Sequence, residues 1–285
     1  MTTDSPLVGI VGAGRLGGAL AVGLSRAGYR IGAIGSTRIS SASAVAEAIG
    51  GVAEATSDVT RVAAVCDLVF FTVPDSAVES SCDTVRWTPR HMVVHCSGAL
   101  TLDALKSAAS VAAVGCLHPL QTFPSRLPEP DRFHGIFCGV EGTTGLGETL
   151  ERMAAALGAS VVRLEGSNRA LYHAAAVMMS NNAVALAAAA SRLWALAGLP
   201  PDLGRPALSP LLQAAAANIG KLELVDALTG PIARGDLATV TAHLRALQGE
   251  PELLVLYRLL AGELLRLSLP HSEGTAKLLR EVLGS

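Results

Sequence analysis

The sequence predicts an α/β protein, with a doubly wound Rossmann domain over residues 1–165 followed by an all-α domain over residues 166–285. Three observations lead to this prediction. Short β-rich runs alternate with helical patterns up to residue 163. A glycine-rich turn follows the first apolar run. Beyond that point the strand signal ends, and the chain reads as helices rich in alanine and leucine.

The alternation in the N-terminal domain defines its elements. Strands are expected at residues 7–11, 30–34, 68–73, 92–96, 111–117, 135–140 and 160–163. Helical patterns lie between them at residues 16–27, 41–49, 59–65, 76–85, 102–108 and 146–157. Near-continuous apolar runs such as 68–73 indicate strands that are buried on both faces. The sheet is therefore expected to be mostly parallel, with helices on both sides.

The C-terminal domain begins with a long alanine-rich helix, expected over residues 168–197. Breaks are expected at 198–201, 204–210, 230–231, 249–251 and 269–270, where glycine or proline occurs. The first helix would span about 45 Å, more than a helical domain of about 120 residues covers by itself. We therefore expect a homodimer with its interface mainly in residues 166–285. The alternative is a monomer whose long helix packs on its own Rossmann domain.

Composition limits the partners and the compartment. Half of the residues are hydrophobic, 16% are charged, and the formal net charge is -2, which favours a small-molecule substrate over nucleic acid or a membrane surface. Residues 1–6 lack the pattern of a signal peptide. The cysteines are odd in number and without C-x-x-C spacing, so neither a metal site nor a disulfide framework is expected. These features predict a reduced, cytoplasmic protein.

The glycine-rich turn carries the most specific chemical signal. Its residues are Gly12, Ala13, Gly14, Arg15, Leu16 and Gly17, directly after an apolar strand and at the start of a helix. In a dinucleotide site the first glycine permits the tight turn, the second lets the backbone approach the pyrophosphate, and the third lets the helix pack on the strand. The helix N-terminus then favours the negative charge. The alternative is a purely structural glycine turn.

The end of the second strand indicates the cofactor. An NAD-binding domain usually places a carboxylate there for the ribose 2′-hydroxyl. This chain has Ser36, Thr37 and Arg38 instead, two hydroxyls and a guanidinium that suit a 2′-phosphate. The sequence therefore predicts NADP as the cofactor. The alternative is that Arg38 is an ordinary loop arginine.

Later strands end in residues that are expected to line the same crevice. Val73 and Pro74 are predicted to contact the nicotinamide ribose. Ser97 is placed near the nicotinamide, or else it serves as a turn or capping residue. His118 could bind a substrate carboxylate or carbonyl, or it could support its own loop.

A polar strip lies on the first helix of the second domain. His173, Ser180 and Asn181 share one face at helical spacing, in a run otherwise rich in alanine. His173 is a candidate proton donor, with an intrinsic pKa of roughly 6.5. The alternative is a hydrogen-bonded polar cluster in a core or an interface. Further on, Arg234 could pair with Asp236 or bind a substrate carboxylate.

Taken together, these residues resemble a bacterial family with a Rossmann-like domain and a C-terminal domain of unknown function. The resemblance covers the whole chain, and it rests on six stretches: residues 12–17, 73–75, 95–98, 118–123, 172–181 and 229–236. It places the chain in the superfamily of 6-phosphogluconate dehydrogenase-like C-terminal domains and ketopantoate reductases. It also implies dimerisation through the helical domain. In ketopantoate reductases a lysine and an asparagine stand where this chain has His173 and Asn181.

The sequence leaves three hypotheses for function. The first is an NADPH-dependent reductase of a small 2-oxo acid, such as ketopantoate, with His173 as proton donor and with Asn181 and Ser97 orienting the substrate oxygen. His118 or Arg234 would hold the carboxylate. The second is a cyclic imine reductase of the pyrroline-5-carboxylate reductase type. The third is a non-catalytic NADP-binding module.

Overall fold

The computed structural model describes residues 5–125, 129–143, 145–267 and 272–284. The chain divides into two compact units, Met1–Ser180 and Asn181–Ser285. The strand–helix alternation ends with strand β8 (Ser160–Arg163), next to the predicted boundary at residue 165. Helix α7 (Arg169–Met179) then belongs to the N-terminal unit. Of the N-terminal residues on which the signal-peptide expectation rests, 1–4 lie outside the described residues.

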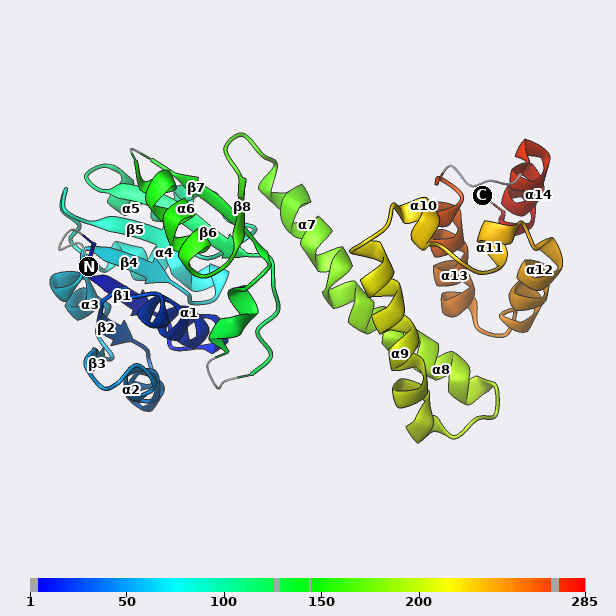
Figure 1. Ribbon diagram of the computed structural model, residues 1–285, viewed down its shortest axis with the longest axis horizontal. Helices are drawn as coiled ribbons and strands as arrows, with labels where there is room; N and C mark the ends of the chain where they lie inside the picture. The colour runs from blue at the N-terminus through cyan, green and yellow to red at the C-terminus, as the bar shows by residue number, and fades with distance from the viewer. Residues whose placement is uncertain (1–4, 126–128, 144, 268–271, 285) are drawn as a thin grey trace. The chain divides into compact units, whose positions relative to one another are not determined.

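The N-terminal unit contains an eight-stranded sheet with the order β3-β2-β1-β4-β5-β6-β7-β8 (Figure 1). Every neighbouring pair is parallel except β6 and β7. The sequence did not predict β3, which is short and has no fully buried residue to give it an apolar signal. The other strands are β1 (Val8–Val11), β2 (Ile31–Gly35), β3 (Glu54–Thr56), β4 (Leu68–Phe71), β5 (Met92–His95), β6 (Ala113–Pro119) and β7 (Phe137–Gly142).

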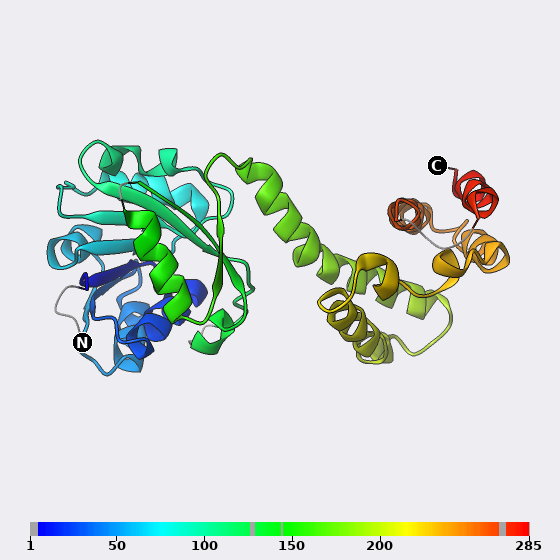
Figure 2. The same cartoon turned by 45° about the horizontal axis from the view of Figure 1, so that its top comes forward.

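Helices cover both faces of this sheet, as the two views show (Figures 1 and 2). One buried cluster joins the sheet to α1 (Arg15–Arg26), α2 (Ile39–Ala48) and α6 (Leu146–Ala156). A second cluster, on the other face, joins it to α3 (Val59–Val65), α4 (Asp75–Asp83), η1 (Leu102–Leu105) and α5 (Lys106–Ala109). A short turn, η2 (Pro130–Phe133), adds Phe133 to the first cluster. The predicted doubly wound α/β architecture is confirmed.

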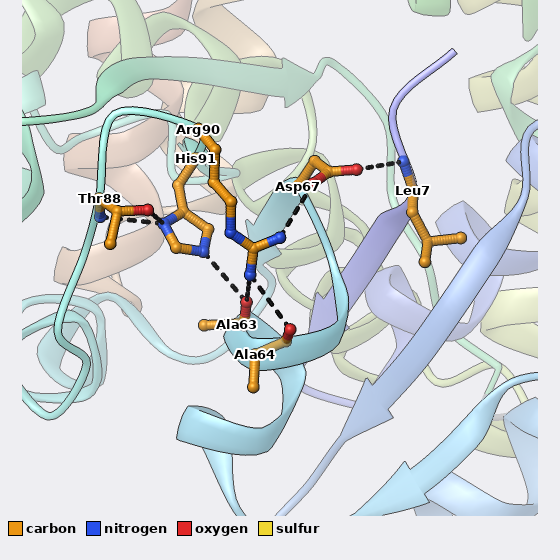
Figure 3. A network of polar contacts seen from close by, with 7 residues as sticks. All are labelled: Leu7, Ala63, Ala64, Asp67, Thr88, Arg90 and His91. Atoms are coloured by element: carbon orange, nitrogen blue, oxygen red, sulfur yellow. Dashed lines mark hydrogen bonds and ion pairs between the residues drawn. The ribbon is translucent and has the colours of Figure 1, made fainter. Parts of the chain in front are cut away.

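A polar network fixes the amino ends of the central strands (Figure 3). The Arg90 guanidinium donates to Asp67 Oδ1 at 3.1 Å and to the carbonyls of Ala63 and Ala64. Asp67 in turn accepts from the backbone N–H of Leu7, just before β1. Because these contacts tie down the amino ends, the carboxyl ends of the same strands are free to present their loops to ligands.

Strands β6 and β7 send alternate side chains to opposite faces. Leu117, Cys138 and Val140 join the first buried cluster. Cys116 and His118 therefore point to the other face, where Glu141 and Gly139 are their partners on β7. Helix α7 packs its own polar side chains on this second face, and the candidate site forms there.

The C-terminal unit is entirely helical in its described residues. Its helices are α8 (Asn181–Leu196), α9 (Pro201–Ile219), α10 (Leu224–Ala227), α11 (Pro231–Arg234), α12 (Leu237–Ala246), α13 (Pro251–Leu264) and α14 (Glu273–Leu283). A small core joins α11 to α14 around Val240 and Leu279. In contrast, α8 has no buried residue.

Two expectations for these helices need correction. The helix expected over 168–197 is divided at Ser180, the cap of α7 (φ -117°, ψ -71°), whose hydroxyl donates to the carbonyl of Ala176 at 2.7 Å, and α8 follows directly at Asn181. The break expected at 269–270 lies outside the described residues. The break expected at 204–210 is wrong, because α9 continues through Pro206 and Pro210. These prolines are one turn apart, so both missing N–H groups lie on a single helix face.

One segment has the length and composition of a membrane span. It is Arg169–Leu196, which combines α7 and α8 and has a mean hydropathy of 1.3 in its most apolar window. By itself this is weak evidence. Part of α7 is fixed to the sheet by polar contacts, and Arg192 on α8 lies within 4.0 Å of carboxylates at Glu250 and Glu252. The α/β fold of the N-terminal unit is of a soluble type.

Candidate functional site

The glycine-rich turn has the geometry that a pyrophosphate site needs. Gly12 has φ of +111°, a conformation that favours glycine. A Cβ on Gly17 would lie 1.9 Å from the carbonyl oxygen of Gly12, so only glycine lets α1 approach β1. A Cβ on Gly14 would meet nothing within 4 Å, which leaves open space beside the backbone there. The roles predicted for the three glycines fit this geometry.

The other residues of the motif support the turn. Arg15 is exposed at the first position of α1, while Ala13 and Leu16 pack against the first buried cluster. The sequence did not single out Thr72, whose hydroxyl at the end of β4 lies 2.7 Å from the carbonyl oxygen of Gly12. Thr72 thereby holds the turn against the neighbouring strand.

The loop after β2 presents the predicted 2′-phosphate residues to solvent. Thr37 and Arg38 are exposed and Ser36 is half-buried. The Ser36 hydroxyl accepts from the backbone N–H of Arg38 at 3.3 Å, which shapes the loop at the start of α2. After β4, Val73 packs against the second cluster and Pro74 stands at the N-cap of α4. These residues fit an NADP cofactor at the carboxyl ends of β1, β2 and β4.

Replacing Arg38 with alanine is expected to weaken NADPH binding by about 1.5–3 kcal/mol, the value of hydrogen bonds to a charged group. NADH binding should change little, because its ribose lacks the 2′-phosphate. Titration of both cofactors checks this prediction. Equal losses for the two would mean that Arg38 does not read the phosphate.

A second group of polar residues lies where α7 packs against β6, the strand next to β5 in the sheet. The His118 Nδ1 lies 2.8 Å from the Tyr172 hydroxyl, and the His118 and His173 rings are 6.0 Å apart between centroids. Gly98, just after β5, packs against both imidazoles: a Cβ there would lie 2.8 Å from His118 Nε2 and 2.8 Å from His173 Nδ1. The two ring nitrogens therefore face a common point beside Gly98.

Burial and nearby charges set the protonation states of His118 and Tyr172. Burial, with the neighbouring His173 and Arg169, lowers the pKa of His118 to about 4, so its imidazole is neutral near pH 7. Burial raises the pKa of Tyr172 to about 12, so the phenol keeps its proton. The phenol is the better donor and the imidazole nitrogen the better acceptor. Tyr172 therefore donates to Nδ1, and the His118 proton resides on Nε2, toward Gly98.

Ser97 is engaged in the local turn. Its hydroxyl oxygen accepts from the backbone N–H groups of Ala99 and Leu100, both at 3.1 Å. This is the turn role that the sequence left open for Ser97. His95, at the end of β5, accepts at Nδ1 from the Ser97 N–H at 3.2 Å. Burial and the Arg169 charge lower the pKa of His95 to about 4, so a second neutral imidazole stands behind the site.

Arg169 brings a buried positive charge to the same face of the sheet. Its side chain is 4% exposed and stands one helical turn before His173 on α7. Glu141 on β7 approaches it at 3.3 Å through Oε2, without the alignment of a hydrogen bond. Cys116 is also adjacent, and its thiol pKa is raised by burial to about 11, so it carries no compensating charge.

Asn181, Arg234 and Asp236 belong to the second compact unit. Asn181 is exposed at the start of α8. Arg234 is exposed at the end of α11. Asp236 caps α12 by accepting from Thr239 N at 3.0 Å and pairing with its hydroxyl. The substrate-orienting role of Asn181 therefore stays a prediction.

Sequence reasoning missed Tyr172, Arg169 and Glu141. Helical spacing places Arg169 one turn before His173 on α7, but that spacing does not show its burial, and the contact of Tyr172 with His118 is not local. Glu141 could not be assigned, because its neighbour on β6 depends on the antiparallel register of β7. The same register brings Gly139 under Tyr172, where a Cβ would lie 2.5 Å from the hydroxyl.

Comparison with known families agrees with this geometry. Residues 7–98 match the family model described as "NADP oxidoreductase coenzyme F420-dependent". Residues 136–264 match the model described as "Domain of unknown function (DUF2520)", which begins just before β7 and includes α7. The N-terminal part therefore resembles the Rossmann domains of NADP oxidoreductases, and the region that follows resembles the DUF2520 model. The predicted NADP cofactor is confirmed as the cofactor of this class of oxidoreductases.

Several solved structures are similar to this chain over nearly its full length. A candidate NADP oxidoreductase of Bacteroides fragilis is 28% identical, with a TM-score of 0.71, and the alignment covers 92% of this chain and 98% of that one. The protein TM1727 of Thermotoga maritima is 27% identical, with a TM-score of 0.70, covering 98% and 100% of the two chains. A reductive aminase of Aspergillus terreus in complex with NADPH shares the fold at 16% identity, with a TM-score of 0.65 and coverage of 98% and 99%. The search of curated proteins found no match.

Proposed function

We propose that this chain is an NADPH-dependent reductase of a small carbonyl or imine compound. The observation that carries the proposal is the convergence of His118 Nε2 and His173 Nδ1 beside Gly98, at the carboxyl end of β5. When bound, NADPH supplies a hydride. In open α/β sheets ligands bind outside the carboxyl ends of the strands, so this pair is well situated to contact a substrate.

The residues divide the remaining work between them. The His118 Nε2–H donates a hydrogen bond to the substrate oxygen or nitrogen, and Tyr172 keeps that proton in place from the other side of the ring. His173 Nδ1 is buried and has no hydrogen-bond partner among the described residues, so a bound substrate atom can engage it. His173 supplies the proton that completes the reduction.

The neutral state of His118 favours the imine among the two acceptor classes. A carbonyl oxygen becomes an alkoxide during reduction and needs an acid, whereas an imine can arrive already protonated. With a pKa of about 4, His118 is not a cation at neutral pH and serves as a hydrogen-bond donor only. A cyclic imine is thus at least as well supported as a 2-oxo acid such as ketopantoate. Because His118 supplies no proton, reduction of a carbonyl would rely on His173 alone, and we therefore place the imine first.

Replacing His173 with alanine distinguishes an imine substrate from a carbonyl substrate. NADPH oxidation by this variant is measured with pyrroline-5-carboxylate and with a panel of 2-oxo acids. Loss of the proton donor is expected to cost about 100-fold or more with a carbonyl and much less with an imine. His243→Ala is the matched control, since His243 stands 3.0 Å from Tyr257 in a similar pair on α12 and α13. Abolished imine reduction in His173→Ala, with NADPH binding intact, would return the carbonyl to first place.

We also propose a cytoplasmic homodimer that associates through α8 and α9. Large apolar side chains on these helices are exposed, among them Leu186, Leu211 and Leu212. They line a cavity of about 310 Å³ together with Ala187 and other residues of both helices. An apolar surface of this kind on a chain with this composition supports burial against a second copy.

Light scattering at micromolar concentration tests the assembly. The expected mass is twice the chain mass of 29.1 kDa. Leu212→Glu should shift the population toward the monomer, because a carboxylate cannot be buried unpaired in an apolar interface. A single wild-type species at the mass of one chain would contradict the proposed dimer.

A further inference from the structure

Arg169 has more hydrogen-bonding capacity than the protein satisfies. Its side chain is buried, and its Nε, Nη1 and Nη2 atoms have no oxygen or nitrogen hydrogen-bond partner among the described residues; the adjacent Cys116 sulfur is only a weak acceptor. A guanidinium carries five N–H donors in a planar fork, and buried donors in native proteins are nearly always paired. A buried arginine with this many open donors is expected to have a partner that binds from outside the chain.

Glu141 compensates the charge of Arg169 only in part. Its Oε2 lies 3.3 Å from one guanidinium nitrogen, in a contact that lacks hydrogen-bond alignment. Its side chain is 23% exposed, so it can turn to solvent at small cost. Burial raises the pKa of Glu141, although the Arg169 charge acts in the opposite direction.

Arg169 also lies on the same face of α7 as His173. It precedes His173 by one turn, so their Cβ atoms are about 6 Å apart. The Arg169 charge also lowers the pKa of His118, so the guanidinium lies close enough to act on that ring. A molecule whose carboxylate adjoins its reducible carbon suits this placement.

We propose that Arg169 binds the carboxylate of the substrate, which displaces the Glu141 carboxylate and pairs with the guanidinium through both oxygens. The incoming group has the same size and charge as the one that leaves, so the exchange needs no new cavity. This inference rests on the proposed reductase function and narrows the substrate class to 2-oxo or imino carboxylates. The carboxylate role that the sequence offered to His118 or Arg234 thereby passes to Arg169.

The test measures binding without turnover. Oxamate, a non-reducible analogue of a 2-oxo acid, and its neutral counterpart oxamide are titrated calorimetrically into the full chain loaded with NADP⁺. Oxamate is expected to bind at least tenfold more tightly than oxamide, and inorganic phosphate should not compete with it. Arg169→Met should weaken oxamate binding about 30-fold or more, and Arg169→Lys about tenfold, because lysine keeps the charge but loses the fork.

Two further variants separate recognition from a structural role. Glu141→Gln removes the competing carboxylate, and we expect oxamate to bind at least twofold more tightly as a result. Arg163→Gln alters an exposed arginine on β8 that pairs with Glu151, and it should leave oxamate affinity unchanged. NADP⁺ affinity reports in each case whether the N-terminal unit is folded.

The outcomes decide the proposal in either direction. It is overturned if oxamide binds as well as oxamate, if oxamate does not bind, or if Arg169→Met leaves the oxamate affinity intact. Should Arg169→Met not fold, Glu141→Gln decides alone: tighter oxamate binding supports the proposal, and unchanged or weaker binding overturns it. Reduction of neutral imines or ketones in the absence of oxamate binding would refute the carboxylate site while the reductase function stands.

Discussion

Replacing Gly98 with alanine is expected to lower the rate of substrate reduction by about 100-fold, since displacements near 1 Å in a reacting group have effects of this size. The added Cβ would lie 2.6 Å from Cε1 of His118 and 2.8 Å from Nδ1 of His173, so both rings must move. Gly98 is far from the glycine-rich turn in sequence, and its backbone is not in the positive-φ region. NADPH affinity should therefore be nearly unchanged.

The measurement compares the steady-state rate and the NADPH dissociation constant in Gly98→Ala with those in Gly147→Ala. Gly147 is also a glycine of the N-terminal unit, but its Cβ would meet only ordinary contacts, the nearest being the Gly142 carbonyl oxygen at 3.6 Å. The control should retain full activity. Wild-type rates in Gly98→Ala would show that the two imidazoles do not take part in the reaction.

Replacing Gly17 with alanine is expected to destabilise the N-terminal unit by about 3 kcal/mol and to abolish NADPH binding, because overpacking against rigid backbone cannot relax by side-chain movement. The new Cβ would lie 1.9 Å from the Gly12 carbonyl oxygen and 2.4 Å from the Thr72 hydroxyl oxygen. Helix α1 would have to move away from β1, and the turn between them would open.

Gly14→Ala complements Gly17→Ala, because it is expected to change NADPH binding without changing stability. Its Cβ would meet nothing within 4 Å in the protein, so thermal unfolding should be unaffected while NADPH binding weakens. The methyl group occupies space that the pyrophosphate needs. Chemical denaturation and cofactor titration on both variants check the contrast. A stable Gly17→Ala protein with normal NADPH affinity would contradict the assigned role of this turn.

Much of the N-terminal unit was predictable because its signals are local. Apolar strands, helical spacing and the Gly12–Gly17 turn each appear in consecutive residues, and the structure has the order that they imply. The candidate cofactor residues were found for the same reason. Strand β3 was missed because three half-buried residues give no periodic pattern.

The second half of the site depends on contacts that no local pattern contains. Tyr172 belongs to the site only because the packing of α7 on β6 places its hydroxyl 2.8 Å from His118 Nδ1. The importance of Arg169 follows from its burial, which a sequence does not display. Similarly, the helix expected over 168–197 is divided into α7 and α8 at Ser180, where the hydroxyl bonds to the carbonyl one turn before it.

The His118–His173 pair beside Gly98 is proposed to serve a reduction that uses NADPH. The most direct test is a single-turnover experiment, in which the full chain loaded with NADPH is mixed with pyrroline-5-carboxylate and with a panel of 2-oxo acids. We expect loss of NADPH absorbance with at least one of these acceptors, and strong impairment in a His118→Ala, His173→Ala double variant. Tight NADPH binding without oxidation by any of them would refute the proposed reduction and favour a non-catalytic NADP-binding module.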